Sequence, residues 1–282
     1  MGTRKGSSMK NLIIGGYTNY QYDLIKPWVK SIGEVCDPKT TDKVMVVGNT
    51  TQEAIDALTA DGWILVPMIQ GQPHVVRFFS IFDYLKDNWQ KYKYVVTTDV
   101  RDVIFQADPF KYLEEELGPL GMGFGLVCGS ESIQYKNEPW GDENLLQCYG
   151  PYIHALYRDK EIYNVGVLGG RSEYVKDLVL NIAINSVNRP IPIVDQAVFN
   201  MLMNTQPYQD TVFFAKQENA WACQAGTVAD PRIIDRFRPH LLEKEPVWKN
   251  GKVYTWNGAL FTIVHQYDRV PEWNEVIQER YK

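Results

Sequence analysis

The chain has 282 residues, of which 45% are hydrophobic, 22% charged and 13% aromatic, and its formal net charge is −5. This composition is typical of a soluble globular protein and excludes global disorder. The acidic balance and the lack of any basic block argue against a nucleic-acid partner.

No apolar run approaches the ~18–20 residues that a membrane-spanning helix requires, so no membrane span is expected. The cysteines are widely separated, which favours neither a zinc site nor a disulfide framework and predicts a reducing, cytoplasmic location. They are Cys36, Cys128, Cys148 and Cys223. Residues 1–8 precede a second methionine and are expected to be an added or disordered tail, whereas residues 9–282 are expected to form one domain.

The N-terminal part alternates apolar runs with amphipathic stretches. Residues 11–17 predict a strand, and a helical pattern runs from about residue 22 to 35. A strand over 43–49 precedes a helix that Thr50 is expected to cap and that ends near Gly62. The next elements in chain order are a strand over 63–69 weakened by Pro67, a helix over 75–89 and a strand that ends at Asp99. Continuous apolar strands separated by helices predict a mostly parallel α/β sheet covered on both faces.

The pattern after Asp102 is less regular. Strands are expected over 123–130 and 162–170, helices over 172–187 and 197–203, and short strands and loops in the C-terminal part. Ligands of open α/β sheets bind outside the carboxyl ends of the strands, which is where Asp99 lies.

Common catalytic motifs are missing from the sequence. There is no GxxxxGK[ST] loop, and the glycines of GMGFG (121–125) have the wrong spacing for a dinucleotide-binding loop. GGRSE (169–173) offers backbone N–H groups to an anion, but an ordinary strand-to-helix turn explains it equally well. Without GxSxG or a persuasive Cys–His pair, a serine or cysteine hydrolase is poorly supported.

Two carboxylates, Asp99 and Asp102, follow the strand of the stretch YVVTTDVRD. Paired carboxylates suit a hard divalent cation, although aspartates also cap turns. His265 follows another apolar run, and an imidazole that joins two carboxylates favours Mn²⁺ over Ca²⁺. A structural hydrogen bond is the alternative role for this histidine.

The order of several short motifs resembles that of GT-A nucleotide-sugar glycosyltransferases, and the glycogenin-like (family 8-type) group is the most similar. The resemblance spans residues 11–268, and its motifs are TNYQY, RFFSIFDYL, YVVTTDVRD, YNVGVLGG, VDQAVFN and VHQYDR. It implies a single-domain, Rossmann-like GT-A fold.

The resemblance also implies roles for individual residues. Thr18, Asn19 and Tyr22 would contact the nucleotide. Arg77 would contact the diphosphate or ribose, and Val100 would lie beside the donor. The resemblance assigns the metal to Asp99 and His265, the donor sugar to Asn164 and Gly166, and the neighbourhood of the reacting carbon to Asp195 and Gln196. For Asp195, a role as helix cap is an equal alternative.

Two positions depart from the family pattern. A strict DxD motif needs Asp at 101, where this chain has Arg101, so the second acid is Asp102. In the interpretation that we favour, the backbone bulges so that Asp102 binds the metal directly. In the alternative, Asp102 only supports the metal ligands, and Arg101 supplies part of the positive charge that the metal would otherwise provide. The alternative for Arg101 is an ion pair with a neighbouring acid. Arg269 is expected to supply a positive charge near the phosphates, with a plain surface position as its alternative.

The function that the resemblance implies is a metal-dependent transfer of a sugar from a nucleotide sugar, a UDP-sugar, to a hydroxyl of a glycan acceptor, with Mn²⁺ or Mg²⁺. The likeness favours retention of configuration, whereas Asp195 acting as a base would give inversion. Residues 131–146 are expected to form an acceptor-facing loop in which Trp140 either stacks on a sugar or is buried. The alternatives are a sugar nucleotidyltransferase, which the lack of a basic glycine-rich loop disfavours, and a non-catalytic binding protein of the same fold.

Overall fold

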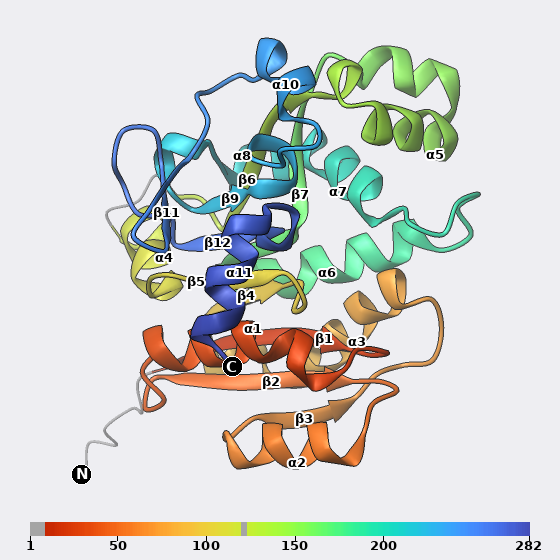
Figure 1. Ribbon diagram of the computed structural model, residues 1–282. Coiled ribbons are helices and arrows are strands. Elements are labelled where there is room, and N and C mark those ends of the chain that lie inside the picture. Colours follow the sequence, from red (N-terminus) through yellow and green to blue (C-terminus); the bar gives the residue numbers. More distant parts are fainter. Residues whose placement is uncertain (1–8, 120–122) are drawn as a thin grey trace.

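The computed structural model describes residues 9–119 and 123–282. The expected tail over 1–8 and part of the glycine-rich stretch 121–125 lie outside the described residues. A seven-stranded sheet of order β3-β2-β1-β4-β7-β6-β8 forms the centre of the molecule (Figure 1). Its strands are β1 (Lys10–Tyr17), β2 (Thr41–Val47), β3 (Ile64–Pro67), β4 (Tyr92–Thr98), β6 (Leu126–Gln134), β7 (Glu161–Arg171) and β8 (Val212–Ala215).

The sheet is mostly parallel, as predicted. The pairs β3–β2, β2–β1, β1–β4 and β6–β8 are parallel, and β7 runs antiparallel to both of its neighbours. Strand β1 lies inside the sheet, and the chain first adds β2 and then β3 on one side of it. It then returns to add β4 on the other side of β1, which makes the β1–β4 junction a topological switch point.

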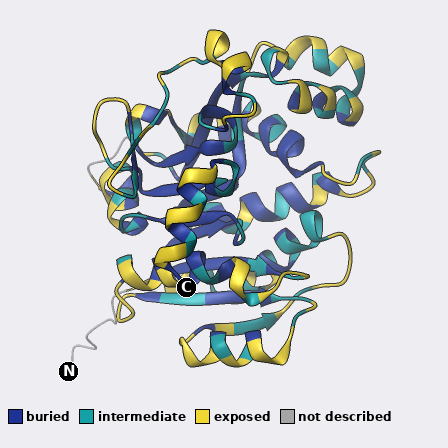
Figure 2. Cartoon of the chain, in the orientation of Figure 1, coloured by how far each residue is buried: buried dark blue, intermediate teal, exposed yellow. Residues whose placement is uncertain are grey.

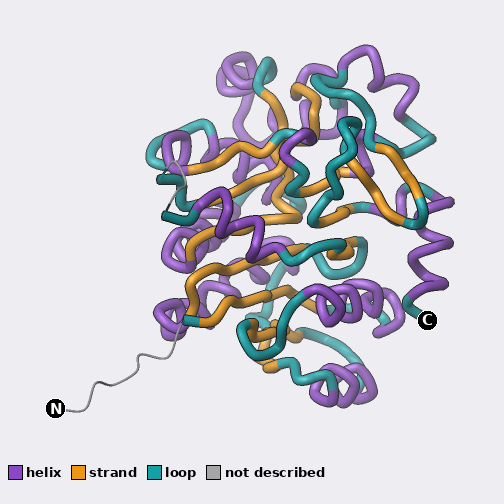
Figure 3. The backbone as a smooth tube through the Cα atoms, turned by 90° about the vertical axis from the view of Figure 1, so that its left-hand side faces the viewer, coloured by secondary structure: helices purple, strands orange, loops and turns teal. Residues whose placement is uncertain are grey.

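Helices cover both faces of the sheet (Figure 3). Alternate residues of β1 enter two different cores: Ile13 packs with Trp28 of the first helix, while Leu12 packs with Phe78 of the third. These residues are almost fully buried, in agreement with the dark central layer of Figure 2. The helices are α1 (Tyr22–Val35), α2 (Gln52–Ala60), α3 (Pro73–Asn88), α4 (Pro109–Leu117), α5 (Pro139–Tyr157), α6 (Ser172–Ser186), α7 (Asp195–Met203), α8 (Tyr208–Thr211), α9 (Ala225–Val228), α10 (Ile234–Phe237) and α11 (Pro271–Arg280).

A second, three-stranded sheet of order β5-β12-β9 packs against the first. Its strands are β5 (Val103–Phe105), β9 (Ala222–Gln224) and β12 (Ile263–His265), and a separate hairpin joins β10 (Val247–Lys249) to β11 (Lys252–Tyr254). Because β4 ends at Thr98 and β5 begins at Val103, residues 99–102 connect the two sheets.

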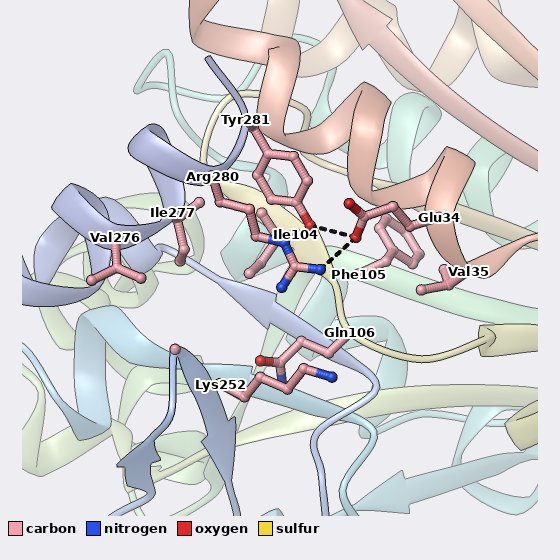
Figure 4. A pocket seen from close by; sticks show the side chains of 11 residues that line it. Glu34, Val35, Ile104, Phe105, Gln106, Lys252, Val276, Ile277, Arg280 and Tyr281 are labelled. Carbon is pink, nitrogen blue, oxygen red and sulfur yellow. Dashed lines mark hydrogen bonds and ion pairs between the residues drawn. The ribbon is translucent and has the colours of Figure 1, made fainter.

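The C-terminal helix fastens the end of the chain to the first helix. Glu34 of α1 accepts hydrogen bonds from the Arg280 guanidinium at 2.8 Å and from the Tyr281 hydroxyl at 3.0 Å (Figure 4). These groups line a cavity of about 220 Å³ between α1, β5 and α11. Because Glu34 is already paired with Arg280 and Tyr281, we interpret this cavity as a packing gap beside a structural contact.

Several predicted boundaries are corrected by the structure. Thr51, not Thr50, caps α2, because its hydroxyl accepts a hydrogen bond from the backbone N–H of Ala54 at 3.3 Å. The strand expected over 123–130 begins only at Leu126. The loop expected over 131–146 is wrong: this segment finishes β6, passes through a short 3-10 turn and enters α5. In the described residues, every helix is too short or too polar to cross a bilayer.

Candidate active site

A cavity of about 640 Å³ opens at the carboxyl ends of β1 and β4, at the switch point of the sheet. Its floor comes from the ends of these strands and from β7, and its walls come from α3, α5, α7, α9 and α10. All but one of the predicted site residues line it. They are Thr18, Asn19, Arg77, Asp99, Val100, Asp102, Asn164, Gly166, Asp195, Gln196, His265 and Arg269, and the exception is Tyr22.

Three predicted metal ligands meet at the floor of this cavity. Ligand atoms of Asp99, Asp102 and His265 all lie within 4.8 Å of one another. His265 Nε2 is 3.4 Å from Asp99 Oδ2 and 3.7 Å from Asp102 Oδ1. The connection between the two sheets therefore places Asp102 inside the cluster, which is the arrangement expected from a bulged DxxD motif.

Strand pairing fixes the position of the histidine. His265 ends β12 and pairs with Val103 of β5, next to Asp102, while its parallel neighbour on the other side is Gln224 of β9. Its Nδ1 lies 2.8 Å from Gln224 Oε1. An Nδ1–H that donates to this oxygen leaves the lone pair of Nε2 directed at the two carboxylates.

Arg77 joins the cluster to the helix that begins with Asp195. One guanidinium nitrogen is ion-paired with Asp99 Oδ1, and the other lies 2.8 Å from Asp195 Oδ2. The Arg77 side chain is only 18% exposed. The resemblance implied contact with a phosphate or ribose, but the structure gives this guanidinium two carboxylates, so its charge is already balanced.

The electrostatics of the cluster are dominated by burial and mutual attraction. Burial raises the pKa of Asp99, but Arg77 and His265 outweigh it and hold this pKa below its usual range. For Asp102, burial prevails and raises the pKa. Burial lowers the pKa of His265, but the carboxylates of Asp99 and Asp102 more than offset this and raise it. Without a metal, bound protons thus reduce the repulsion within the cluster of Asp99, Asp102 and His265, as a divalent cation would also do.

The donor set fits a divalent cation. Two carboxylate oxygens and one imidazole nitrogen are ligands that Mn²⁺ accepts readily and that Mg²⁺ accepts in part. The hydrogen bond from Nδ1 to Gln224 is the kind of outer support that metal-binding histidines usually have.

A buried carboxylate that the sequence analysis did not single out organises the wall beside the cluster. Glu131 Oε1 accepts hydrogen bonds from Asn164 Nδ2 at 2.8 Å and from Gln196 Nε2 at 2.7 Å, and Oε2 accepts one from Thr227 at 2.9 Å. The amide oxygens of Asn164 and Gln196 accept from the backbone N–H groups of Gly166 and Val165. Both amides are therefore locked in one orientation.

The end of the cavity nearest β1 carries Thr18, Asn19 and Tyr20. Tyr20 is the tyrosine of TNYQY that lines the cavity, and the Arg101 guanidinium lies over its ring at 5.9 Å. Tyr22 instead starts α1 and packs against the core on that side of the sheet. The sequence offered both tyrosines in one motif, and the start of the helix decides which one faces the cavity.

The two arginines near the mouth are paired with acids. Arg101 lies 3.4 Å from Asp102 and 3.7 Å from Asp268, so the ion pair considered for Arg101 is present. Arg269 lies 3.5 Å from Asp268 and is 36% exposed. Both side chains are partly exposed to solvent and border the cavity.

Comparisons with known proteins support the fold. No protein-family model matches the sequence, and no curated protein matches it. Among solved structures, the apo bifunctional glycosyltransferase WbbM superposes with a TM-score of 0.56 at 12% identity, over 97% of this chain and 50% of its own. Apo mouse xyloside xylosyltransferase 1 superposes with a TM-score of 0.50 at 12% identity, over 91% of this chain and 97% of its own.

The chain has the GT-A glycosyltransferase fold. It spans half the length of the WbbM chain that it matches. Neither neighbour singles out the glycogenin-like group that the motifs resemble.

Proposed function

We propose that this protein is a metal-dependent glycosyltransferase that moves a sugar from a nucleotide sugar, a UDP-sugar, to an acceptor hydroxyl. The observation that carries the proposal is the cluster of Asp99, Asp102 and His265 at the switch point of a GT-A sheet, on the floor of a cavity of about 640 Å³. The order of motifs favours a place near the glycogenin-like group.

The departure of a nucleoside diphosphate builds negative charge on its phosphates. A divalent cation, Mn²⁺ or Mg²⁺, held by Asp99, Asp102 and His265 would supply the positive charge that stabilises this leaving group. Arg77 holds Asp99 by one oxygen, which keeps its other oxygen turned toward His265. Arg101 and Arg269 border the same cavity and add positive charge at its mouth.

The sugar would lie against the wall formed by Asn164, Gln196 and Asp195. Each locked amide has one N–H in a bond to Glu131, which leaves its second N–H for a sugar oxygen. Asp195, held by Arg77, would place negative charge near an oxocarbenium-like transition state. The glycogenin likeness favours retention of configuration, whereas Asp195 acting as a base would give inversion. The anomer of the product, observed by NMR, distinguishes the two.

The test is release of UDP from a panel of UDP-sugars, with and without Mn²⁺. We expect metal-dependent release that Asp99→Ala abolishes and that the matched surface change Asp159→Ala leaves intact, since Asp159 lies outside the cavity and pairs with Lys136. Release that continues unchanged without metal and in Asp99→Ala would overturn the proposed metal site. Tight UDP binding without turnover, over a broad acceptor panel, would favour a binding protein.

A further inference from the structure

We propose that Glu131 is the positioning residue that sets selectivity among donor sugars. Through Asn164 and Gln196, it presents two adjacent N–H groups to neighbouring hydroxyl oxygens of the bound sugar. The inference rests on the proposed function and adds the group that decides which sugar is accepted. It follows from the contacts of one buried carboxylate with side chains that β7, α7 and α9 supply.

The Glu131 carboxylate is buried among neutral partners. The residue is only 7% exposed, and its hydrogen bonds come from two amides and from the hydroxyl of Thr227. Within residues 9–119 and 123–282, no lysine, arginine or histidine pairs with it. Burial of a carboxylate without a cation costs free energy that an apolar side chain would not cost. Its presence is therefore better explained by its effect on the amides than by stability.

Both amides bond the same oxygen of Glu131. Asn164 Nδ2 lies 2.8 Å and Gln196 Nε2 lies 2.7 Å from Oε1, so the two nitrogens are neighbours in the cavity wall. The backbone N–H groups of Gly166 and Val165 hold the amide oxygens at 2.7 and 2.8 Å. Each amide keeps a second N–H for a ligand. Two donors this close match the oxygens of neighbouring hydroxyls on a sugar ring, and they bind a sugar less well when one hydroxyl points away.

An irregular piece of strand β6 aims Glu131 at the cavity. The pairing of β6 with β7 changes register at Ser130, the residue before Glu131. Ser132, the residue after it, is fully buried and has a left-handed backbone with φ of 57°. Its backbone N–H donates to Ser130 Oγ at 2.7 Å, and its hydroxyl lies 3.2 Å from Glu243 Oε2. Bulges and left-handed residues redirect side chains near active sites, and this one directs Glu131 into the wall.

The experiment measures UDP release in the presence of Mn²⁺ from UDP-glucose, UDP-galactose, UDP-xylose and UDP-N-acetylglucosamine. Each of the last three sugars differs from glucose at one ring position. The readout is the ratio of kcat/KM between the best and the poorest donor of the wild type. Because this ratio does not depend on the fraction of folded enzyme, a merely structural role of Glu131 would not change it.

Two variants separate the position of the acceptor oxygen from the charge. Glu131→Gln loses the charge but keeps one oxygen for both amides, and its own N–H can donate to the Thr227 hydroxyl. Glu131→Asp keeps the charge but withdraws the carboxylate by one methylene, so the amides lose their shared partner. The matched control is Glu34→Asp, because Glu34 also accepts two hydrogen bonds and lies outside the cavity.

We expect the ratio to stay within about threefold of the wild type in Glu131→Gln and to fall by about tenfold in Glu131→Asp. Glu34→Asp should leave it unchanged. If Glu131→Asp releases too little UDP, the affinities of the same donors, measured by calorimetry, give the ratio instead.

An unchanged ratio in Glu131→Asp, a lost preference in Glu131→Gln, or a wild type without preference among the donors would each overturn the inference. Release of UDP from none of the donors by the wild type, over a broad acceptor panel, would instead overturn the proposed function itself.

Discussion

His265 Nδ1 lies 2.8 Å from Gln224 Oε1, and this bond decides which ring nitrogen faces the carboxylates of the cluster. Replacing Gln224 by Met keeps the volume of the side chain but removes the acceptor. We expect divalent-metal affinity to fall by about 10–100-fold, because the imidazole loses the partner that sets its tautomer and orientation. Titration with Mn²⁺ measures this loss.

The matched change is Gln147→Met on the exposed face of α5, where the amide contacts only Glu143. It should leave metal affinity unchanged. Equal affinities of Gln224→Met and the wild type would mean that the hydrogen bond does not orient a ligand.

Gly166 has no side chain, and His265 and Asp99 occupy the space that a side chain at this position would need. A Cβ at this position would lie 2.5 Å from His265 Cε1 and 2.8 Å from Asp99 Oδ2, closer than real Cβ atoms approach other heavy atoms. Gly166→Ala should therefore push the ligands apart, lower metal affinity and UDP release together, and cost about 1–3 kcal/mol of unfolding free energy.

Gly33 provides the matched control, because a Cβ there meets no atom within 4 Å and the residue lies inside α1. Gly33→Ala should raise the free energy of unfolding by about 0.5–1 kcal/mol and leave activity as it is. Full activity and metal binding in Gly166→Ala would show that the metal lies elsewhere.

Arg77 is a largely buried cation between two carboxylates. Arg77→Met keeps much of the side-chain length but leaves Asp99 and Asp195 without their partner. We expect a loss of about 3 kcal/mol in unfolding free energy, measured by urea denaturation, together with a loss of activity. Arg238→Met, which breaks exposed ion pairs with Asp235 and Glu245 outside the cavity, should leave both nearly unchanged. A stable and active Arg77→Met protein would contradict the positioning role.

The stability gained from metal should depend on pH. In the metal-free protein the pKa of His265 is raised above its ordinary value of 6.5, so its contribution to stability is present below that pH and is lost as the pH rises through the raised value. Metal needs the neutral imidazole. The rise in Tm caused by Mn²⁺ should therefore grow as the pH increases through and above about 6.5. A rise in Tm that is constant or larger at low pH would contradict this assignment of the ligand.

The sequence predicts the N-terminal half of the fold well because its elements are strongly patterned. The helix expected from about residue 22 to 35 is α1, and its apolar residues Ile25, Trp28, Val29 and Ile32 are all buried. Two adjacent threonines, Thr50 and Thr51, have the same capping chemistry, so only the backbone geometry identifies the cap.

The C-terminal half shows where local pattern is insufficient. The proline, tryptophan and acidic residues of 131–146 predict a loop, yet proline suits the first turn of a helix and Glu138 caps it. No local pattern marks Glu131 as a site residue, because its partners are distant in the chain. Asn164, Gln196 and Thr227 are 33, 65 and 96 residues away. A contact network of that span leaves no motif in a single sequence.

The metal-ligand assignment is the central claim, and direct titration of Mn²⁺ by calorimetry in the presence of UDP tests it most directly. The proteins to compare are the wild type, His265→Ala and the control His154→Ala, whose ring pairs with Asp142 outside the cavity. We expect one Mn²⁺ per chain in the wild type and in His154→Ala, and no saturable binding in folded His265→Ala. Undiminished binding in His265→Ala would contradict the account.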